Sequence, residues 1–397
     1  MVIKRKEFLQ IGSLATASFM LPKFLKAFER PMMVPPGNKV VVVIQFSGGN
    51  DGLNTVIPVR NDIYYKARPK LGIAKDKSLI ITDEVGLNPA LEAFKGLYDD
   101  GSLSILNSVG YPNPDRSHFR SMDIWHSASA SNEYVNTGWV GRYLDAQCKG
   151  CDKPTQAMEL DDVLSLALKG EQSKGLAFKD PKKLYNTSNG KFLKDVSANH
   201  QQGEETIDYL YKTMSETISS ADYIYQQSKA HPSAASYPNT NLGKDLKTIA
   251  SLIFSDINTK VYYVSLGSFD THVNQEGQQK RLFTELNDAV KAFTGDLKKN
   301  NRFDDVLMMT FSEFGRRVSQ NASGGTDHGT ANNMFFISGG LKQKGVLNAM
   351  PDLADLNEGD LKHKVDFKNV YATVLSKWLE ADDKMILGNK YSHLNFV

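Results

Sequence analysis

Carboxylate and imidazole side chains recur in this sequence next to apolar stretches. The residues concerned are Asp51, Asp270, His272, Glu313, Asp327 and His328. Carboxylate oxygen and imidazole nitrogen are both good ligands of zinc, manganese and iron. Glycines flank most of these positions, which lets a loop turn tightly and approach a ligand closely. Repetition of one pattern favours a single shared site, and we expect it to hold one or two divalent cations, chosen among zinc, manganese, iron and calcium.

Each of these residues also has a purely structural interpretation. Asp51 could serve a turn, Asp270 could cap a helix, Asp327 and His328 could lie in a solvated turn, and Glu313 could pair with Arg316 or Arg317. The shared site is preferred because the same arrangement recurs at several apolar stretches.

A second candidate group is the run Arg116, Ser117 and His118. It lies between an apolar stretch and a predicted helix, and a helix N-terminus together with arginines favours an anion. Ser117 is a candidate nucleophile activated by a metal. His118 is a candidate general acid or metal ligand, and Arg116 or Arg120 would hold substrate oxygens. The alternative is that Ser117 caps the helix while His118 packs locally.

The elements that must position these residues follow from the apolar pattern. Continuous β-branched runs without polar alternation are typical of strands buried on both faces of an α/β sheet. We expect strands at residues 39–46, 103–109, 261–266, 306–311 and 334–337, and helices at 90–99, 121–127, 203–229, 242–257, 278–298 and 367–379. Ligand sites of open α/β sheets lie beyond the carboxyl ends of the strands, where most of the candidates occur.

Composition restricts the class of protein. The chain has 397 residues, of which 41% are hydrophobic and 23% charged, with a net charge of +2. These values fit one large globular α/β domain and argue against a nucleic-acid binder that depends on bulk charge. No phosphate-binding loop, dinucleotide fingerprint or G-x-S-x-G elbow occurs, which argues against nucleotide enzymes and serine-triad hydrolases. We expect residues 39–397 to form the domain, with a polar helical or loop insertion near 152–240.

The N-terminal segment looks like a targeting sequence. Residues 1–30 carry six basic and two acidic side chains, and a mildly apolar stretch at 11–21 follows the basic patch. Eleven residues are too few to cross a bilayer of roughly 30 Å as a helix. The order resembles a twin-arginine export signal, with Arg5-Lys6 in place of two arginines. We expect an export signal or N-terminal anchor, a linker at 31–38, and location in the periplasm or envelope; an amphipathic N-terminal helix is the alternative.

The chain has two cysteines, Cys148 and Cys151. Two thiols cannot form a four-thiolate zinc site. A redox pair is one interpretation, and a local disulfide is the preferred one for an exported protein.

Several motifs occur in an order that resembles the domain-of-unknown-function family 1501. They are residues 46–58 (FSGGNDGLNTVIP), 64–69, 116–119 (RSHF), 123–125, 138–142, 269–272 (FDTH), 312–316 (SEFGR) and 325–329 (GTDHG). The resemblance covers nearly the whole chain. It implies the alkaline phosphatase and sulfatase superfamily, and therefore a three-layer α/β/α sandwich with a mostly parallel central sheet and a largely helical insertion.

The resemblance also implies roles for particular residues. Asp51 resembles the aspartate after the first strand, Ser117 the metal-bound nucleophile, and Asp270 with His272 an Asp-His metal pair. His328 resembles the last metal-binding histidine; alternatively Asp327 and His328 are the Asp-His pair, and the last histidine is missing or is His393.

The function implied is an exported metal-dependent hydrolase acting on phosphate or sulfate esters of a small molecule or glycan. One alternative is a non-catalytic envelope protein whose degenerate site binds a glycan or protein partner. A superfamily isomerase or transferase that moves a phosphoryl group is a weaker one.

Overall fold

The computed structural model describes residues 38–147, 155–190 and 205–397, with side chains omitted for 205–216. The expected export signal, most of the expected linker, and both cysteines lie outside the described residues. Within the described residues, no helix is both long and apolar enough to cross a membrane.

The central sheet has nine strands, in the order β11-β5-β10-β9-β1-β8-β6-β7, with β14 also paired to β5. Their bounds are β1 Val40–Phe46, β5 Leu103–Gly110, β6 Ala157–Glu159, β7 Leu176–Ala177, β8 Val261–Leu266, β9 Val306–Phe311, β10 Asn332–Ile337, β11 Gly345–Val346 and β14 Val365–Asp366. Each of the five predicted strands is present. Strand β1 lies between β8 and β9, and all of its residues are buried, as a continuous β-branched run requires.

One strand runs against the others. β10 pairs antiparallel with both β5 and β9, whereas β1 pairs parallel with β8 and β9. The start of β10 therefore lies at the same sheet edge as the ends of β1, β5, β8 and β9. The loops that carry the candidate residues meet at this edge.

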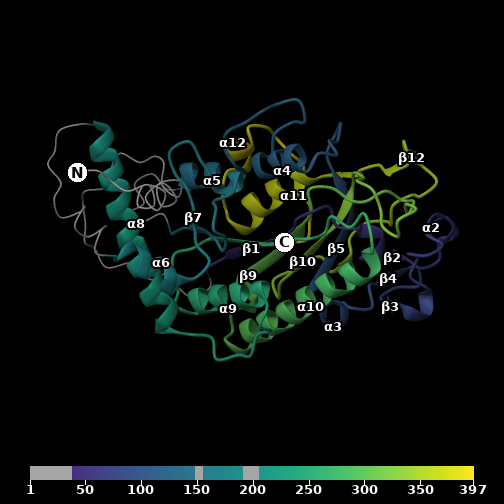
Figure 1. Cartoon of the computed structure of the whole chain (residues 1–397), viewed down its shortest axis with the longest axis horizontal. Helices are drawn as coiled ribbons and strands as arrows, with labels where there is room; N and C mark the ends of the chain where they lie inside the picture. The colour runs from purple at the N-terminus through teal and green to yellow at the C-terminus, as the bar shows by residue number, and fades with distance from the viewer. Residues whose placement is uncertain (1–37, 148–154, 191–204) are drawn as a thin grey trace.

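Helices cover both faces of the sheet, which gives the expected three-layer sandwich (Figure 1). One layer contains α3 Glu92–Asp99, α9 Asn241–Phe254 and α10 Gln275–Lys299; the other contains α4 His118–Ser127, α5 Trp139–Gln147, α11 Phe367–Thr373 and α12 Asp383–Leu387. Several helices start at a side chain that accepts a backbone N–H, namely Asn61, Asp180, Thr240, Asp366 and Asp382.

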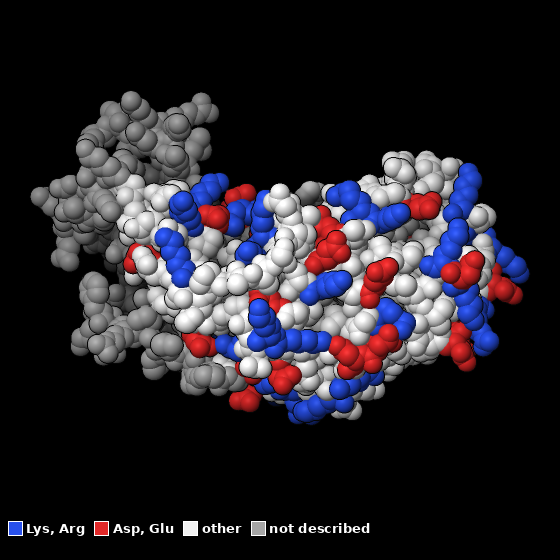
Figure 2. All heavy atoms as spheres, turned by 90° about the horizontal axis from the view of Figure 1, so that it is seen from below, with Lys and Arg blue, Asp and Glu red and all other residues white. Residues whose placement is uncertain are grey.

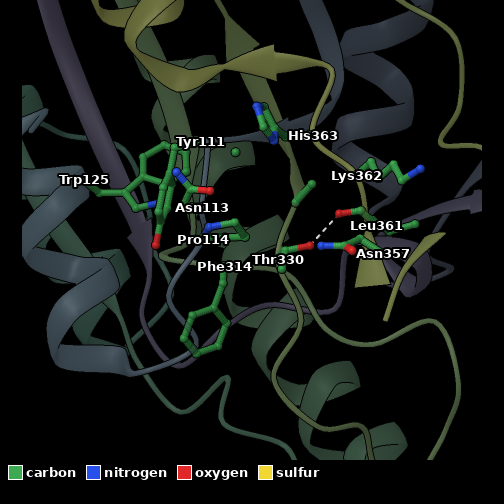
Figure 3. A pocket seen from close by; sticks show the side chains of 12 residues that line it. Tyr111, Asn113, Pro114, Trp125, Phe314, Thr330, Asn357, Leu361, Lys362 and His363 are labelled. Carbon is green, nitrogen blue, oxygen red and sulfur yellow. Dashed lines mark hydrogen bonds between the residues drawn. The ribbon is translucent and has the colours of Figure 1, made fainter. Parts of the chain in front are cut away.

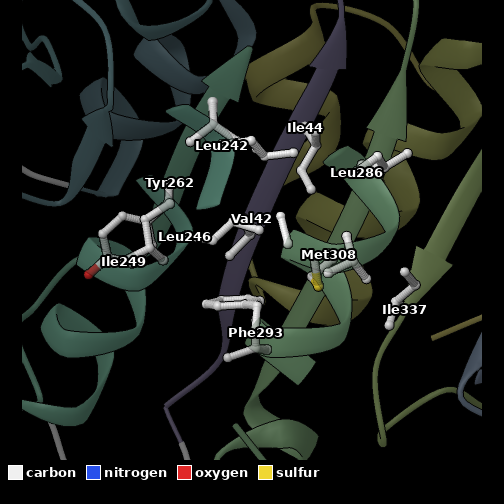
Figure 4. Packing of buried hydrophobic residues seen from close by; sticks show 14 of the residues in the cluster. Val42, Ile44, Leu242, Leu246, Ile249, Tyr262, Leu286, Phe293, Met308 and Ile337 are labelled. Carbon is white, nitrogen blue, oxygen red and sulfur yellow. The ribbon is translucent and has the colours of Figure 1, made fainter. Parts of the chain in front are cut away.

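The sheet separates two hydrophobic cores. Val42 and Ile44 of β1 pack with Leu246 of α9 and Phe293 of α10 (Figure 4). Val41 and its alternate neighbours of β1 instead pack in the core beneath α4 and α11. This alternation follows from the two-residue period of a strand, which turns successive side chains to opposite faces.

The predicted insertion near 152–240 is less separate from the sheet than expected. Its described part contains α6 Pro181–Ser188 and α8 Glu205–Ala230, which contact each other. It also contributes β6 and β7 to the sheet, because β6 pairs parallel with β8. These strands have three and two residues, which is too short to give a periodic signal in the sequence.

Smaller elements surround the sheet. They are β2 Val56–Pro58, β3 Leu79–Ile80, β4 Val85–Leu87, β12 Leu356–Asn357, β13 Asp360–Leu361, α2 Asp62–Ala67, the short helical turns Gly52–Asn54, Lys75–Lys77, Leu166–Leu168 and Phe303–Asp305, and the π-helical turn Val374–Trp378. The predicted helix at 367–379 is thus α11 followed by that π-helical turn. On the face covered by α9 and α10, basic and acidic side chains are interspersed (Figure 2), in keeping with the near-balanced net charge.

Candidate metal centre

Three histidines and one aspartate converge at the sheet edge described above. His118 is the first residue of α4, Asp270 and His272 follow β8, and His328 precedes β10. We call these four residues the histidine cluster. Their side chains come together because the antiparallel direction of β10 brings its leading loop to the carboxyl ends of the parallel strands.

The ligand atoms of the histidine cluster face one another. His328 Nε2 lies 3.1 Å from His118 Nε2, 3.0 Å from His272 Nε2 and 3.2 Å from Asp270 Oδ1. Asp270 Oδ1 also lies 3.0 Å from His272 Nε2, and its Oδ2 lies 3.6 Å from His118 Nε2. Among the described residues, His118, Asp270 and His328 each offer a ligand atom within 4.8 Å of the other two.

The second nitrogen of each ring shows where the protons are. Nδ1 of His118 donates to Glu313 Oε1 at 2.9 Å, Nδ1 of His272 to Asp327 Oδ1 at 3.1 Å, and Nδ1 of His328 to the carbonyl of Arg116 at 2.9 Å. A carbonyl or carboxylate oxygen can only accept, so each Nδ1 carries the proton. In the neutral ring, Nε2 therefore carries no proton. Its lone pair points toward the other potential metal-ligand atoms.

The pKa shifts of Asp270 and His328 agree with this assignment, whereas that of His118 has the opposite direction. Partial burial tends to raise the pKa of Asp270, but the hydrogen bond and charge of the Arg316 guanidinium outweigh it and hold this pKa at about 2. Burial lowers the pKa of His328, which favours the neutral ring. The hydrogen bond to Glu313 raises the pKa of His118. At neutral pH Asp270 is therefore an anion facing an uncharged imidazole.

This donor set fits a transition-metal cation. Lone pairs and a carboxylate at such separations repel one another unless a positive charge is shared between them. In a tetrahedral site with bonds of about 2.0–2.1 Å, ligand atoms lie roughly 3.3 Å apart, close to the 3.1 and 3.2 Å that separate His328 Nε2 from His118 Nε2 and from Asp270 Oδ1. Imidazole-rich sites suit zinc or iron, whereas calcium requires oxygen ligands.

Glu313 and Asp327 have a supporting position. Both were predicted as ligands, but their carboxylates orient His118 and His272 from behind. Glu313 is 1% exposed and also accepts the backbone N–H of Gly48 at 2.8 Å. Gly48 has φ +117°, and a Cβ there would lie 2.4 Å from the backbone nitrogen of Asp270. A glycine at this position allows the loop after β1 to pack against the loop after β8.

Arg316 joins the loops that carry the centre. Its guanidinium is buried and forms an ion pair of 2.7 Å with Asp270. It also donates to the carbonyls of Gly48, Gly49, Phe269 and Thr326. One planar group therefore connects the loops after β1 and β8 to the loop before β10, which suits the fixed donor geometry of arginine.

Asp51 was predicted as a ligand, but the structure places it elsewhere. It is 1% exposed, and its Oδ2 accepts from Arg68 Nη1 and from Gln275 Nε2, each at 2.5 Å. Its Oδ1 accepts the backbone N–H of Leu53 at 3.2 Å. Both carboxylate oxygens are therefore engaged within the protein, and this geometry corresponds to a buried ion pair and not to a ligand of the histidine cluster.

We expect Asp51→Asn to lower the free energy of unfolding by about 3–5 kcal/mol, because the buried guanidinium of Arg68 would lose its counter-charge. The metal content should stay at the wild-type level. Urea denaturation and elemental analysis of the same preparation would test both parts. The double variant Asp51→Asn/Arg68→Met should recover part of the stability, whereas loss of metal without loss of stability would make Asp51 a ligand after all.

The Arg116–Ser117–His118 group is divided by the structure. His118 is in the histidine cluster. Ser117 is exposed at the N-cap of α4, its hydroxyl makes no capping hydrogen bond, and its backbone N–H is held by Asp115 Oδ1 at 2.7 Å. The guanidinium of Arg116 turns to Asp360.

Arg120 is not available to hold a substrate. It is buried, donates to the carbonyls of Ala130, Ser131 and Glu133, and stacks on the Tyr134 ring at 4.0 Å. His393, the alternative last histidine, instead contacts Asp383 at 3.1 Å.

Three residues that border the centre have no site role in the sequence-based prediction: Arg316, Phe314 and Arg317. The Phe314 ring lies 4.8 Å from that of His118 and 4.7 Å from that of His328, measured between centroids. All three lie within four residues after Glu313 in the motif SEFGRR. Their proximity in sequence to Glu313, a candidate ligand, was the signal that could have identified them as site residues.

The fold and the site define a three-layer α/β protein with an imidazole-rich candidate metal centre. The chain belongs to the family described as "Protein of unknown function (DUF1501)", whose model matches residues 105–390. The family predicted from the motifs is thereby confirmed. No curated protein sequence matches the chain.

Solved structures with a similar arrangement differ widely in sequence. One is Ps i-CgsB in complex with k-i-k-neocarrahexaose, with 10% identity and a TM-score of 0.42 over 90% of this chain and 75% of that one. Another is the phosphonate monoester hydrolase SpPMH from Silicibacter pomeroyi, with 8% identity and a TM-score of 0.41 over 90% and 78%. A third is the lipoteichoic acid synthase LtaP from Listeria monocytogenes, with 10% identity and a TM-score of 0.36 over 89% and 79%. At these values they carry no argument about the reaction of this chain.

Proposed function

We propose that this protein is an exported, metal-dependent hydrolase of phosphate or sulfate esters. The observation that supports the proposal best is the convergence of the His118, His272 and His328 Nε2 atoms with the Asp270 carboxylate. Export is inferred from the basic and apolar pattern of residues 1–30.

The histidine cluster would hold the cation, and its neighbours would keep it in place. A bound divalent cation supplies Lewis acidity, which polarises an ester oxygen and lowers the pKa of a hydroxyl group. Glu313, Asp327 and the Arg116 carbonyl fix the ring orientations. The Arg316 guanidinium fixes Asp270 as an anion.

Ser117 is the proposed nucleophile. It directly precedes His118, its hydroxyl is exposed, and the hydrogen bond from its backbone N–H to Asp115 fixes the local chain. It stands at the N-terminus of α4, whose N–H groups and dipole favour an anionic ester. Oγ would lose its proton to water and attack phosphorus or sulfur, which breaks the bond to the leaving oxygen; that oxygen takes up a proton to become the alcohol. Water would then release the phosphate or sulfate and return the proton to the serine oxygen.

The test is a comparison of Ser117→Ala with wild type on 4-nitrophenyl phosphate and 4-nitrophenyl sulfate. We expect kcat/KM to fall by about 1,000-fold or more, since a covalent route needs its nucleophile, with metal content unchanged. The exposed Ser392→Ala is the matched control. Equal turnover by Ser117→Ala would exclude the serine route. A fully metal-loaded wild type without any ester turnover would instead favour a non-catalytic envelope protein that binds a glycan or protein partner.

A further inference from the structure

Two arginines beside the histidine cluster share one buried carboxylate. Asp360 is 0% exposed, and it forms ion pairs with Arg116 Nη2 and, at 3.5 Å, with Arg317 Nε. The two arginine side chains are 36% and 38% exposed. Each arginine side chain is thus paired with a buried carboxylate and remains partly exposed to solvent.

Both arginines are attached to the loop that carries His328. The carbonyl of Arg116 accepts from Nδ1 of His328 at 2.9 Å, and the backbone N–H of Arg317 donates to the carbonyl of Asp327 at 3.0 Å. Arg316 and His328 form an isolated antiparallel bridge. The Arg116 and Arg317 side chains therefore start next to the candidate metal centre.

The charges of this group are unbalanced. Among the described residues, the carboxylates within 4.0 Å of either guanidinium are those of Asp360 and Glu358. Glu358 is 3.7 Å from Arg116, and its side chain is 77% exposed, so this contact contributes little and is easily displaced. Two permanent positive charges face the single buried carboxylate of Asp360, which leaves capacity for an anion.

The support for Asp360 is stiff. Asp360 begins β13, directly after a two-residue turn in which Glu358 has φ 53° and Gly359 has φ 89°. Positive φ at both positions matches the twist of a tight hairpin. The next residue, Leu361, accepts a hydrogen bond from Thr330 Oγ1, which ties the hairpin to the segment before β10.

A pocket of about 350 Å³ lies beside this hairpin. Tyr111, Trp125 and Phe314 line it together with Asn357 and Leu361 of the hairpin (Figure 3). The Phe314 ring also contacts the rings of His118 and His328. The pocket has the size of a small organic group, at the lower end of ligand sites, with aromatic walls and polar groups at its edge.

We propose that Arg116 and Arg317 form a second anion site, so that the preferred substrate is an ester whose organic part carries another negatively charged group, such as a sulfate, phosphate or carboxylate. The ester group would lie at the histidine cluster and the organic part in the pocket. This inference rests on the proposed function for the first anionic group.

The experiment uses the full, metal-loaded chain and two ligands without an ester bond. Isothermal titration calorimetry would compare benzenesulfonate with benzene-1,3-disulfonate. We expect wild type to bind the disulfonate about tenfold more tightly, and Arg317→Met to lose this advantage while binding benzenesulfonate unchanged, because one charge-assisted contact is removed. Glu358→Gln should tighten disulfonate binding about twofold. The exposed Arg281→Met is the matched control and should behave as wild type.

A preference for the disulfonate that persists in Arg317→Met, or its absence in wild type, would overturn the second anion site. The Arg317→Lys variant guards against misfolding: it keeps the charge but not the planar fork, and should retain part of the preference. The outcome is separable from that of the proposed function. Arg317-dependent binding without ester turnover would exclude the hydrolase but keep the anion site, whereas turnover of simple aryl esters without the preference would do the reverse.

Discussion

The variant His328→Ala is expected to lose nearly all of its bound metal. In the wild type, Nε2 of His328 lies within 3.2 Å of three other potential ligand atoms of the histidine cluster. Loss of an orienting partner alone typically lowers metal affinity 10–100-fold, so loss of this central ligand should cost more than about 100-fold. Elemental analysis after dialysis, followed by titration of metal back into the protein, measures the change.

Two further variants make this prediction specific. The exposed His231→Ala should keep its metal, which excludes a general effect of removing imidazole. Asp327→Asn should reduce affinity less than His328→Ala does, because Asp327 acts only through His272. Full metal retention in His328→Ala, or equal loss in all three variants, would contradict the assignment of the histidine cluster as the metal centre.

Arg316→Met should lower the free energy of unfolding by about 3–5 kcal/mol, because several buried backbone carbonyls would lose their hydrogen-bond donor at about 1–3 kcal/mol each. The ion pair with the half-exposed Asp270 contributes less. The change removes the partner of Asp270 and leaves the carbonyls of Gly48, Gly49 and Phe269 without this donor. Urea denaturation of the metal-free protein measures this loss apart from metal binding. The metal affinity of the variant should also fall, because Asp270 would no longer be fixed.

Arg316→Lys is the informative companion. An ammonium cannot reproduce contacts to several loops at once, so lysine should recover only a small part of the lost stability. Arg281→Met, at an exposed position of α10, should leave the denaturation midpoint unchanged. A wild-type midpoint in Arg316→Met would mean that the loops are held together by other contacts.

The long elements could be predicted because they bury continuous apolar sequence. The strands β8 and β9 occur at the predicted residues, and β10 extends from Asn332 to Ile337. Its direction, however, was not apparent from sequence, because apolar composition does not distinguish a parallel strand from an antiparallel one. The two- and three-residue strands β7 and β6 were missed since their pairing depends on β8 and not on their own composition.

The candidate site was predicted by residue type more successfully than by role. Asp270, His272 and His328 were expected together, and the structure brings them together with His118. Asp51 has the same sequence signal as Asp270, but Arg68 reaches it from α2's C-terminal end. The two residues are seventeen positions apart in the chain. No local sequence pattern predicts a contact between them. Tertiary packing determines that Asp51 contacts a guanidinium and that Asp270 contacts imidazoles.

The antiparallel course of β10 has a consequence for how the protein matures. His118 and His328 are separated by 210 positions in the chain, and they meet only after β10 has inserted between β5 and β9. A cation held between them acts as a late cross-link across a very long loop, and an unfolded chain offers no such set of ligands. For the proposed metal centre, cation uptake would therefore depend on completed folding, and a chain in which β10 has not docked would remain metal-free.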